Sequence, residues 1–463
     1  MRHVSFRLNK DISMQSTLVA KYGEARLPRY TSYPTAPRFS PAVGADSYGD
    51  WLAAASAEKA ASLYLHIPFC RSMCWYCGCH TTITQRDQPI LDYLDVLRQE
   101  IRLVSEMASK TLTIDHVHFG GGTPTIIKPE EFVDLMGLLR QHFALPGGAE
   151  VAVEIDPRTL EPEMAAVLGE AGVRRASLGV QSFDPVVQKA INRVQSEEQT
   201  MEAVSRLRRA GVESINFDLI YGLPHQTVES CIETARAAIG MRPERFAVFG
   251  YAHVPEFKKH QRLINEKALA DAEGRHAQAE AIATTLAAAG YRRIGLDHFA
   301  RPDDSLAQAQ QEGRLRRNFQ GYTTDAAETL IGLGASAIGR LPEGYVQNEI
   351  PPGLYAQKIA DGQLATTKGY RLTGEDRLRG KIIERLMCDF HVDVPAVAAE
   401  HGFDPGMLLD GNSRLAMLES DGVLENNGGV IRLRGDGRFL IRTVAAAFDA
   451  YLTPSARAHS KAA

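Results

Sequence analysis

Residues 64–80 read Tyr64-Leu65-His66-Ile67-Pro68-Phe69-Cys70-Arg71-Ser72-Met73-Cys74-Trp75-Tyr76-Cys77-Gly78-Cys79-His80, a short apolar run that leads into a cysteine-rich loop. The apolar run is typical of a buried strand, and Pro68 is expected to end it because proline has no N–H for the strand ladder. Cys70, Cys74 and Cys77 follow at a C-x3-C-x2-C spacing. Three thiolates on one loop can each bind one corner of a cubane iron–sulfur cluster, which leaves the fourth iron open to another ligand.

The same cysteines admit other interpretations. A structural zinc ion could take Cys79 as a fourth thiolate, but such sites usually pair two separated cysteine knuckles, and the sequence has no second pair. Covalent haem attachment needs C-x-x-C-H, whereas residues 77–80 are C-x-C-H. The other two cysteines, Cys231 and Cys388, lie in helical patterns and are interpreted as small core residues. This distribution excludes a disulfide framework.

Outward from the cysteine loop, short apolar runs alternate with longer amphipathic stretches. This alternation predicts parallel strand–helix units, and the absence of a dinucleotide fingerprint after the first strand favours a partial (β/α)6 barrel of the TIM type over a doubly wound sheet. A further run at Arg292–His298 is expected to extend the sheet. The predicted strands are Ser62–Ile67, Asp115–Gly120, Glu150–Ile155, Arg175–Gln181, Ser214–Tyr221 and Arg245–Ala252, and the helices between them are Ile90–Met107, Pro129–Phe143, Glu161–Ala171, Glu197–Ala210 and Thr227–Met241.

The two ends of the chain differ from this middle part. Residues 1–60 show little periodicity, and the prolines of Pro28–Ala36 favour an extended arm. After a glycine-rich segment at Gly321–Pro352, three helices and a hairpin resemble a small winged-helix unit. We therefore expect an arm (1–60), a barrel with the cysteine loop (61–365) and a mostly helical C-terminal domain (366–463). The C-terminal elements are expected at Thr373–Phe390, Val394–Glu400, Ser413–Asp421 and, as the hairpin, Val423–Leu433.

Composition sets the class of protein. The 463 residues are 44% hydrophobic and 23% charged, which is enough apolar material for a large core, and the net charge of −4 argues against nucleic acid as a partner. No run of 18 uncharged apolar residues occurs, so no membrane span is expected. Arg2, Arg7, Lys10 and Asp11 interrupt any apolar leader at the N-terminus. A reducing cytoplasm is the expected compartment.

The cysteine spacing at the end of the first strand resembles the radical S-adenosylmethionine superfamily. Membership implies that the cysteines bind a [4Fe-4S] cluster, and that S-adenosylmethionine on the open iron is cleaved to methionine and a 5′-deoxyadenosyl radical. The second strand ends in Gly120-Gly121-Gly122-Thr123-Pro124-Thr125, which resembles the motif of the superfamily for the methionine end of the cofactor. Glycines there let the backbone approach a ligand closely. Polar residues also end the next strands, as expected for a site at the carboxyl ends of a parallel barrel.

Further motifs narrow the resemblance to enzymes of this superfamily that act in haem biosynthesis. That resemblance implies oxidative decarboxylation of two propionates of coproporphyrinogen III to vinyl groups, giving protoporphyrinogen IX, with two S-adenosylmethionine molecules. It also implies a monomer and a low-potential electron donor such as flavodoxin or ferredoxin. The motifs that carry it are Pro28–Ala36, Tyr64–Cys79, Gly120–Thr125, Asp218–Pro224, His298–Asp304 and Asn318–Thr324.

The resemblance assigns roles to individual residues. Cys70, Cys74 and Cys77 would bind the cluster, and His66, Cys79, Phe319 and Gln320 would serve the reaction without binding it. The first S-adenosylmethionine would contact Tyr64, Gly121, Glu154 and Ile338. The second would contact Tyr76, Gly122, Thr123, Gln181, Arg193, Asp218 and Ala252, with Tyr76 a departure from the expected phenylalanine.

The residues allow more than one interpretation of the substrate-binding arginines and of the function. Arg29, Arg301, Arg316 and Arg317 are candidates for the carboxylates of the substrate, because guanidinium groups bind carboxylates in pairs of hydrogen bonds, but each also fits an ordinary surface charge. The alternatives in function are a haem chaperone or a haem-degrading enzyme of the same superfamily, and a metal-binding module without turnover. The chaperone type typically lacks the fourth cysteine and the long arm, and both are present in this chain.

Overall fold

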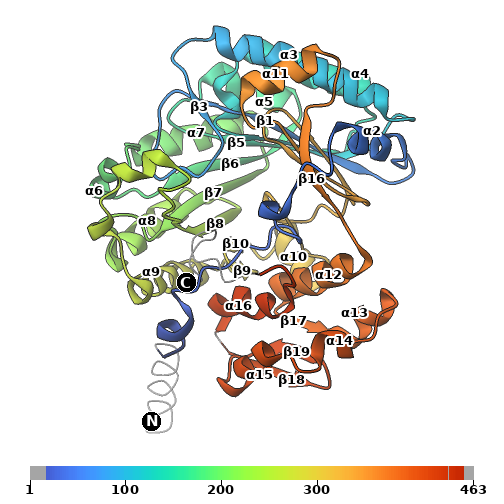
Figure 1. Cartoon of the computed structure of the whole chain (residues 1–463). Coiled ribbons are helices and arrows are strands. Elements are labelled where there is room, and N and C mark those ends of the chain that lie inside the picture. The colour runs from blue at the N-terminus through green and yellow to red at the C-terminus, as the bar shows by residue number, and fades with distance from the viewer. Residues whose placement is uncertain (1–16, 436, 453–463) are drawn as a thin grey trace.

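The computed structural model describes residues 17–435 and 437–452 and has an open, strongly curved sheet as its largest part (Figure 1). Six parallel strands lie side by side in chain order, and each is followed by a helix, which confirms the predicted partial barrel. The strands are β1 (Ala61–Ile67), β4 (Ile114–Gly121), β5 (Glu150–Ile155), β6 (Val173–Gln181), β7 (Ser214–Tyr221) and β8 (Arg245–Gly250), and the helices are α3 (Gln88–Met107), α4 (Pro129–His142), α5 (Pro162–Glu170), α7 (Glu197–Arg209), α8 (Val228–Gly240) and α9 (Ala272–Ala288).

The two faces of this sheet have different chemistry. In β7, the apolar side chains of Ile215, Phe217 and Leu219 are buried in the core, whereas the intervening Asn216 and Asp218 are only partly buried. Side chains alternate between the two faces of a strand, so the polar set points into the barrel while the apolar set packs under the helices. Charged groups of separate strands can therefore face one another inside the barrel.

Other strands extend the sheet at both edges. Beside β1 lies the parallel strand β13 (Thr329–Leu333), followed by three antiparallel strands, β14 (Ile338–Leu341), β15 (Gly344–Asn348) and β16 (Thr366–Arg371). At the other edge, β10 (His298–Ala300) and β9 (Arg292–Ile294) form an antiparallel pair beside β8. The predicted extension at residues 292–298 is thus present, as two strands rather than one.

The glycine-rich segment at 321–352 is sheet, which its composition did not indicate. A Cβ on Gly344 would lie 2.0 Å from the carbonyl oxygen of Tyr370 on the neighbouring strand β16, and one on Gly332 would lie 2.7 Å from the carbonyl oxygen of Ile338. These glycines therefore permit a close approach of neighbouring backbones that a larger residue would prevent.

The C-terminal part contains the predicted helices and hairpin. Helices α12 (Gly374–Asp389), α13 (Val394–Glu400), α14 (Gly406–Leu409) and α15 (Ser413–Ser420) precede the hairpin of β18 (Leu424–Asn427) and β19 (Val430–Leu433), to which β17 (His391–Asp393) adds a third strand. Asn427 pairs with Val430, so Gly428 and Gly429 form the turn, with φ of 62° and 90°. The turn is one residue later than an Asn-Gly turn would be, and both positive φ angles suit glycine.

The N-terminal residues contribute to two hydrophobic cores. Helix α2 (Ala45–Ala53), which the sequence did not predict, buries Trp51 and Leu52 in the core of the barrel. Residues between Val19 and Tyr33 belong instead to the core of the C-terminal part, together with α12 and α16 (Ile441–Ala445). In Figure 1 this stretch runs between the sheet and the orange and red helices. The arm therefore lies where barrel and C-terminal part meet.

Among residues 17–435 and 437–452, no helix has the length and apolar composition to cross a membrane. The predicted interruption of a leader by Arg2, Arg7, Lys10 and Asp11 lies outside the described residues.

Candidate active site

The three predicted cluster cysteines are free thiols that hydrogen-bond donors surround. Thr81 donates to Cys70 Sγ at 3.3 Å, and Thr123 Oγ1 lies 3.4 Å from the same sulfur. The backbone N–H of Cys79 donates to Cys77 Sγ at 3.4 Å. Donors around sulfur stabilise the thiolate, which is the form that binds iron.

The donor set fits an iron–sulfur cluster better than a single metal ion. Within the described part of the chain, no three His, Cys, Asp or Glu side chains are placed to hold one metal ion together. A cubane needs no such convergence, because each thiolate binds a different iron. The side chain of Cys79, followed by its backbone N–H and the nearby His260 and Lys258, lowers the pKa of the Cys77 thiol. Burial raises the pKa of Cys70.

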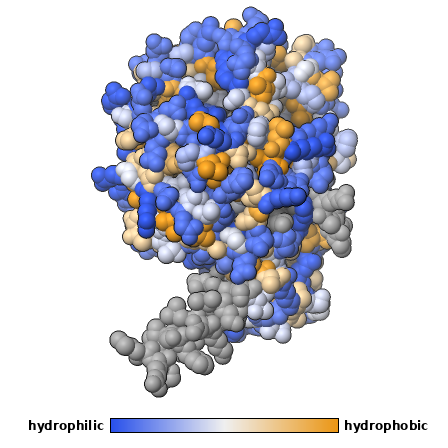
Figure 2. Space-filling view, turned by 90° about the vertical axis from the view of Figure 1, so that its left-hand side faces the viewer, coloured by the Kyte–Doolittle hydropathy of each residue, from blue (hydrophilic) through white to orange (hydrophobic). Residues whose placement is uncertain are grey.

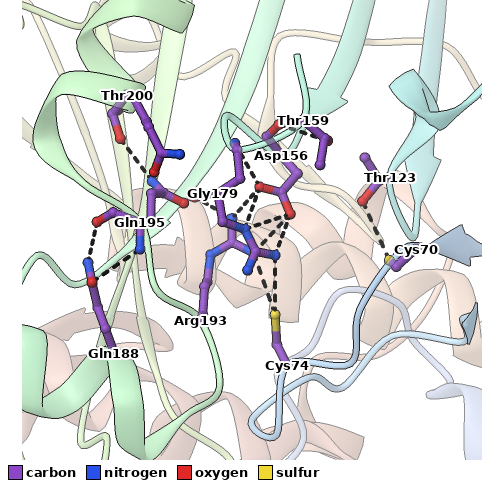
Figure 3. A network of polar contacts seen from close by, with 12 residues as sticks. Cys70, Cys74, Thr123, Asp156, Thr159, Gly179, Gln188, Arg193, Gln195 and Thr200 are labelled. Atoms are coloured by element: carbon purple, nitrogen blue, oxygen red, sulfur yellow. Dashed lines mark hydrogen bonds and ion pairs between the residues drawn. The ribbon is translucent and has the colours of Figure 1, made fainter. Parts of the chain in front are cut away.

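Cys74 is enclosed by two arginines. Arg193 Nη1 lies 3.6 Å from its sulfur (Figure 3). Arg158 Nη2 lies 3.7 Å from the same sulfur. Both guanidinium groups also contact Asp156, at 3.2 Å from Arg193 Nη2 and 2.6 Å from Arg158 Nη2. Burial acts to raise the pKa of Asp156, but the two arginines outweigh it and lower that pKa. The carboxylate thus keeps two positive charges in position against the cysteine.

The glycine motif at the end of β4 lies beside the side chains of Glu154, His118 and Tyr64. Gly121 has φ of +121° and donates its N–H to Glu154 Oε2 at 3.0 Å. His118 Nε2 lies 3.3 Å from Glu154 Oε1, and the rings of His118 and Tyr64 stack at 5.9 Å. Despite burial, these partners lower the pKa of Glu154, so it is a carboxylate at neutral pH. Tyr64, Gly121 and Glu154, which the sequence analysis assigned to one cofactor molecule, lie together.

His66 lies between this group and the cysteine loop. Its Nδ1 is 3.0 Å from the hydroxyl of Tyr64, and its Nε2 is 3.0 Å from the carbonyl oxygen of His80. Burial lowers the pKa of His66, so the imidazole is neutral and a single N–H serves one of these two contacts. Cys79, one residue before His80, is exposed and its carbonyl oxygen accepts from Lys258 at 3.0 Å.

The second predicted group lies along β6 to β8. Gln181 is buried with φ of +67°, and the carbonyl oxygen of Gly179 accepts from Arg193 Nη2 at 2.7 Å. Asp218 accepts from Ser177 at 3.1 Å and Asn216 at 2.8 Å. Burial, with the nearby carboxylate of Glu154, raises the pKa of Asp218 to about 7.

One buried glutamine joins two further members of this group. Gln261 Nε2 donates to the carbonyl oxygens of Tyr76, at 3.0 Å, and Ala252, at 3.2 Å. Gly122 and Thr123 follow Gly121 directly, and a Cβ on Gly122 would lie 2.5 Å from the carbonyl oxygen of Phe69. The glycine motif therefore packs directly on the cysteine loop.

The remaining predicted residues, Ile338, Phe319 and Gln320, lie outside the six parallel strands. Ile338 begins β14 and lies against Gly332, which pairs with Tyr64 of β1. Phe319 and Gln320 lie in the turn between β11 (Arg316–Asn318) and β12 (Gly321–Thr323) rather than on a parallel strand. Phe319 packs on Tyr345, with ring centroids 6.0 Å apart, and lines a cavity of about 420 Å³ between the arm, β14 and α12.

The segment that covers the cysteine loop was not predicted from the sequence. Residues 253–268, after β8, place Lys258 and His260 as donors to the carbonyl oxygens of Cys79 and Cys77, at 3.0 and 2.7 Å. The role of Arg158 was missed too. The dense basic run Lys258-Lys259-His260 was the one available signal for this segment, and it does not say what the segment covers.

The four arginines predicted as candidates for the substrate carboxylates do not all lie at one site. Arg29 and Arg317 line one cavity, where Arg317 donates to the carbonyl oxygen of Arg29 at 3.3 Å. Arg316 pairs with Glu384 at 2.9 Å, and Arg301 lies 3.5 Å from Asp303 near the amino ends of the strands. Arg317 thus lines two cavities, one together with Arg29 and the other, of about 420 Å³, together with Arg316.

Comparison with known proteins adds independent findings. The sequence model of the radical SAM superfamily matches residues 64–238, and that of the HemN C-terminal domain matches residues 372–440. The chain is 59% identical to an oxygen-independent coproporphyrinogen III oxidase of Bradyrhizobium diazoefficiens, over 97% of this chain and 100% of the relative. It is 45% identical to the enzyme of that name from Paracoccus denitrificans, over 95% and 97%. The solved structure of coproporphyrinogen III oxidase (HemN) from Escherichia coli, described as a radical SAM enzyme, matches with a TM-score of 0.88 at 38% identity, over 92% of this chain and 98% of that one.

Proposed function

The chain belongs to the family of oxygen-independent coproporphyrinogen III oxidases, and from that premise we propose how its residues divide the work of the reaction. The enzyme converts two propionate side chains of coproporphyrinogen III to vinyl groups without oxygen, giving protoporphyrinogen IX in haem biosynthesis. Its cofactors are a [4Fe-4S] cluster and two S-adenosylmethionine molecules, which when bound supply the 5′-deoxyadenosyl radical that removes a hydrogen atom from the propionate β-carbon. That carbon bears no acidic hydrogen, so a side-chain base alone could not activate it.

Cys70, Cys74 and Cys77 hold the cluster in this proposal. The donors around each sulfur support the assignment, because they favour the thiolate form. Arg193 offsets negative charge at Cys74 from within a buried ion pair with Asp156. Cys79 is outside the ligand set and lowers the pKa of Cys77 through its side chain and its backbone N–H.

Tyr64, Gly121, Glu154 and Ile338 hold the first S-adenosylmethionine. The carboxylate of Glu154 suits an ammonium group or ribose hydroxyls, and the bare backbone of Gly121 leaves room beside it. His66 is a positioning residue that joins Tyr64 to the cysteine loop. The second molecule is held by Tyr76, Gly122, Thr123, Gln181, Arg193, Asp218 and Ala252.

Phe319 and Gln320 belong to the wall on which the macrocycle lies. Phe319 lines a cavity of about 420 Å³ and Gln320 follows it on the β11–β12 turn, which supports contact with a large substrate rather than with the cluster. The observation that carries the whole proposal is that three thiols and the polar ends of successive parallel strands face the same end of one barrel.

An anaerobic assay tests this function. Purified enzyme with reconstituted cluster receives coproporphyrinogen III, S-adenosylmethionine and a low-potential reductant, and the products are separated by chromatography. We expect protoporphyrinogen IX, carbon dioxide and 5′-deoxyadenosine. An enzyme that cleaves S-adenosylmethionine under these conditions but forms no vinyl product would contradict the assignment.

The electron donor is a small acidic carrier of low potential, such as a flavodoxin or ferredoxin. Residues 253–268 present Lys258, Lys259, Arg262 and Lys267 against only two acidic residues, directly over the cysteine loop. Phe257 and Leu263 are 63% and 59% exposed within this segment. Basic residues around an apolar centre complement an acidic redox protein and speed its encounter with the cluster edge.

The division into an arm (1–60), a barrel (61–365) and a C-terminal domain (366–463) is retained as part of the proposal, since the barrel and the C-terminal part have separate cores. A monomer is supported by exposed hydrophobic residues that are spread over distant segments, and the face with α6 (Pro185–Ala190) and α8 in Figure 2 shows small hydrophobic groups among hydrophilic ones. The free thiols of the described residues fit a reducing compartment such as the cytoplasm.

A further inference from the structure

Five arginines from distant parts of the chain meet at one small cavity. They come from the arm, from α9, from β9, from β11 and from α16, and the space between them is about 60 Å³. The arginines are Arg29, Arg275, Arg293, Arg317 and Arg442. A space of this size accommodates a group of a few heavy atoms but not a macrocycle.

The walls carry more positive than negative charge. Among the described residues, two carboxylates, Asp297 and Glu280, line the same cavity. Glu280 pairs with Arg293 at 3.0 Å, and Asp297 is shared between His298 at 2.8 Å and Arg317 Nη1 at 3.7 Å. Burying several guanidinium groups with so few anions is costly, so the arrangement favours an incoming anion.

Arg317 is a buried arginine of this cavity whose guanidinium is incompletely hydrogen-bonded. The residue is only 8% exposed, lies 4.4 Å over the ring of Tyr322, and its Nη1 has no hydrogen-bond partner. A buried guanidinium nitrogen without a hydrogen bond is uncommon, because an unmade bond of a charged group costs more than that of a neutral one. Burial also lowers the pKa of Arg442, which is 7% exposed, to about 10.

The cavity adjoins the proposed active site. Arg29 Nη2 donates to the carbonyl oxygen of Gly250 at 3.0 Å, and Arg275 Nη1 donates to that of Tyr251 at 2.8 Å. These residues immediately precede Ala252, which we assign to the second S-adenosylmethionine. A group held here is therefore beside the reacting end of the barrel.

We propose that this cavity binds the carboxylate of a propionate that the substrate retains, and that it thereby positions the macrocycle. The proposal rests on the proposed function. A carboxylate that leaves as neutral carbon dioxide must give up its negative charge, so a site with surplus positive charge would oppose its loss. The arginines therefore hold a propionate that does not react, while another extends toward the cysteine loop.

The test compares Arg29→Gln with Arg292→Gln. Arg29 is exposed, so its replacement should leave the fold intact. Arg292 is an exposed arginine next to Arg293 in β9 that does not line the cavity. Initial rates of vinyl formation are measured anaerobically against the concentration of coproporphyrinogen III. Loss of a charge-assisted, bidentate donor should raise KM about tenfold or more in R29Q, with a smaller change in kcat and an intermediate KM in R29K.

A second readout separates this proposal from the function on which it rests. Formation of 5′-deoxyadenosine from S-adenosylmethionine without substrate should be the same in R29Q, R292Q and the wild type. If the wild type forms no vinyl product, the proposed function fails. If it does, and the KM of R29Q is no higher than that of R292Q, the cavity does not bind a substrate carboxylate.

Discussion

Arg193 and Cys74, 119 residues apart in the chain, are in direct contact: the guanidinium Nη1 lies 3.6 Å from the sulfur. Asp156 and the carbonyl oxygen of Gly179 hold the same guanidinium from the other side, as Figure 3 shows. The positive charge therefore cannot move away from the thiol without breaking a buried ion pair. This contact joins the cysteine loop to the ends of β5 and β6.

Replacing Arg193 should affect both the fold and the site. In R193Q the carboxylate of Asp156 keeps only Arg158, and we expect the free energy of unfolding to fall by about 2–4 kcal/mol, as for a broken buried ion pair. The affinity for S-adenosylmethionine should fall about tenfold with the loss of a charged donor. Chemical denaturation and equilibrium binding measure the two effects.

Arg174 provides the control for this change. Its ion pair with Glu213, at 3.2 Å, has both side chains more than half exposed. R174Q should therefore change the free energy of unfolding by less than about 1 kcal/mol. Equal stability of R193Q and R174Q would contradict the structural role of the buried pair.

The four clustered cysteines should separate into ligands and one non-ligand. C70S, C74S and C77S should each lose bound iron and the associated visible absorbance, because each removes one corner of the cluster. C79S should keep iron close to the wild-type amount while its activity falls. Iron and sulfide analysis after anaerobic reconstitution decides this, with Cys231→Ala in the buried face of α8 as the control. Iron loss in C79S as severe as in C77S would indicate four thiolate ligands instead.

Gly121 should tolerate no side chain. A Cβ there would lie 2.8 Å from His66 Cε1 and 2.9 Å from the carbonyl oxygen of Ile67, and φ is +121°. G121A should lower the free energy of unfolding by about 2–4 kcal/mol, because strain adds to the clash, and should abolish S-adenosylmethionine binding. Gly137, in α4, has nothing within 4 Å of the added atom, so G137A should instead be about 0.5–1 kcal/mol more stable. The idea fails if the two alanine variants have equal melting temperatures.

Glu100, buried in α3, should make stability depend on pH. It accepts hydrogen bonds from Gly334 N, Asn348 Nδ2 and Tyr355 at 2.6, 2.6 and 2.8 Å, yet burial raises its pKa from 4.5 to about 7. The ionisable groups that face it are Tyr48, Tyr93 and Tyr355, which burial keeps neutral because it raises the pKa of each.

The sign follows from proton uptake. Between pH 4.5 and 7 the unfolded chain has lost this proton while the folded chain retains it, so stability falls as pH rises through that window, by about 3 kcal/mol in total. E100Q removes this decline, and its stability relative to the wild type should increase from pH 5 to pH 8. Denaturation at several pH values, with exposed Glu106→Gln as the control, measures the difference. Parallel curves for E100Q and the wild type would show that Glu100 is already ionised at pH 5.

The basic segment over the cysteine loop should matter only for a protein donor. Reversal of charge in K259E/R262E should slow turnover with reduced flavodoxin about tenfold or more at low salt, because steering by complementary charge is lost. Turnover with a small chemical reductant should stay at the wild-type rate. The double change R102E/K110E, at two exposed positions in and after α3, alters the net charge equally and should have no effect. Equal slowing of both doubles would place the docking surface elsewhere.

The strand–helix units and the C-terminal elements were predictable because their signals are local. Strand β5 and helix α13 begin and end at the predicted residues, since short apolar runs and helical periodicity repeat within each unit. The strands of the glycine-rich segment could not be predicted, because Gly332 and Gly344 are required by neighbouring backbones and not by their own periodicity. Helix α2 could not be predicted for a related reason, because its burial depends on the barrel against which it packs.

By itself, the sequence determined the cysteine spacing, the glycine motif and the order of strands, because each depends on residues that are close together in the chain. Tertiary structure alone decided which distant charges meet. Arg29, Arg317 and Arg442 each fit an ordinary surface or core position when taken alone, and only the packing of arm, barrel and C-terminal part surrounds one cavity with them. The same holds for the contact of Arg193 with Cys74. Such contacts depend on the path of the whole backbone, for which no local pattern of residues carries a signal.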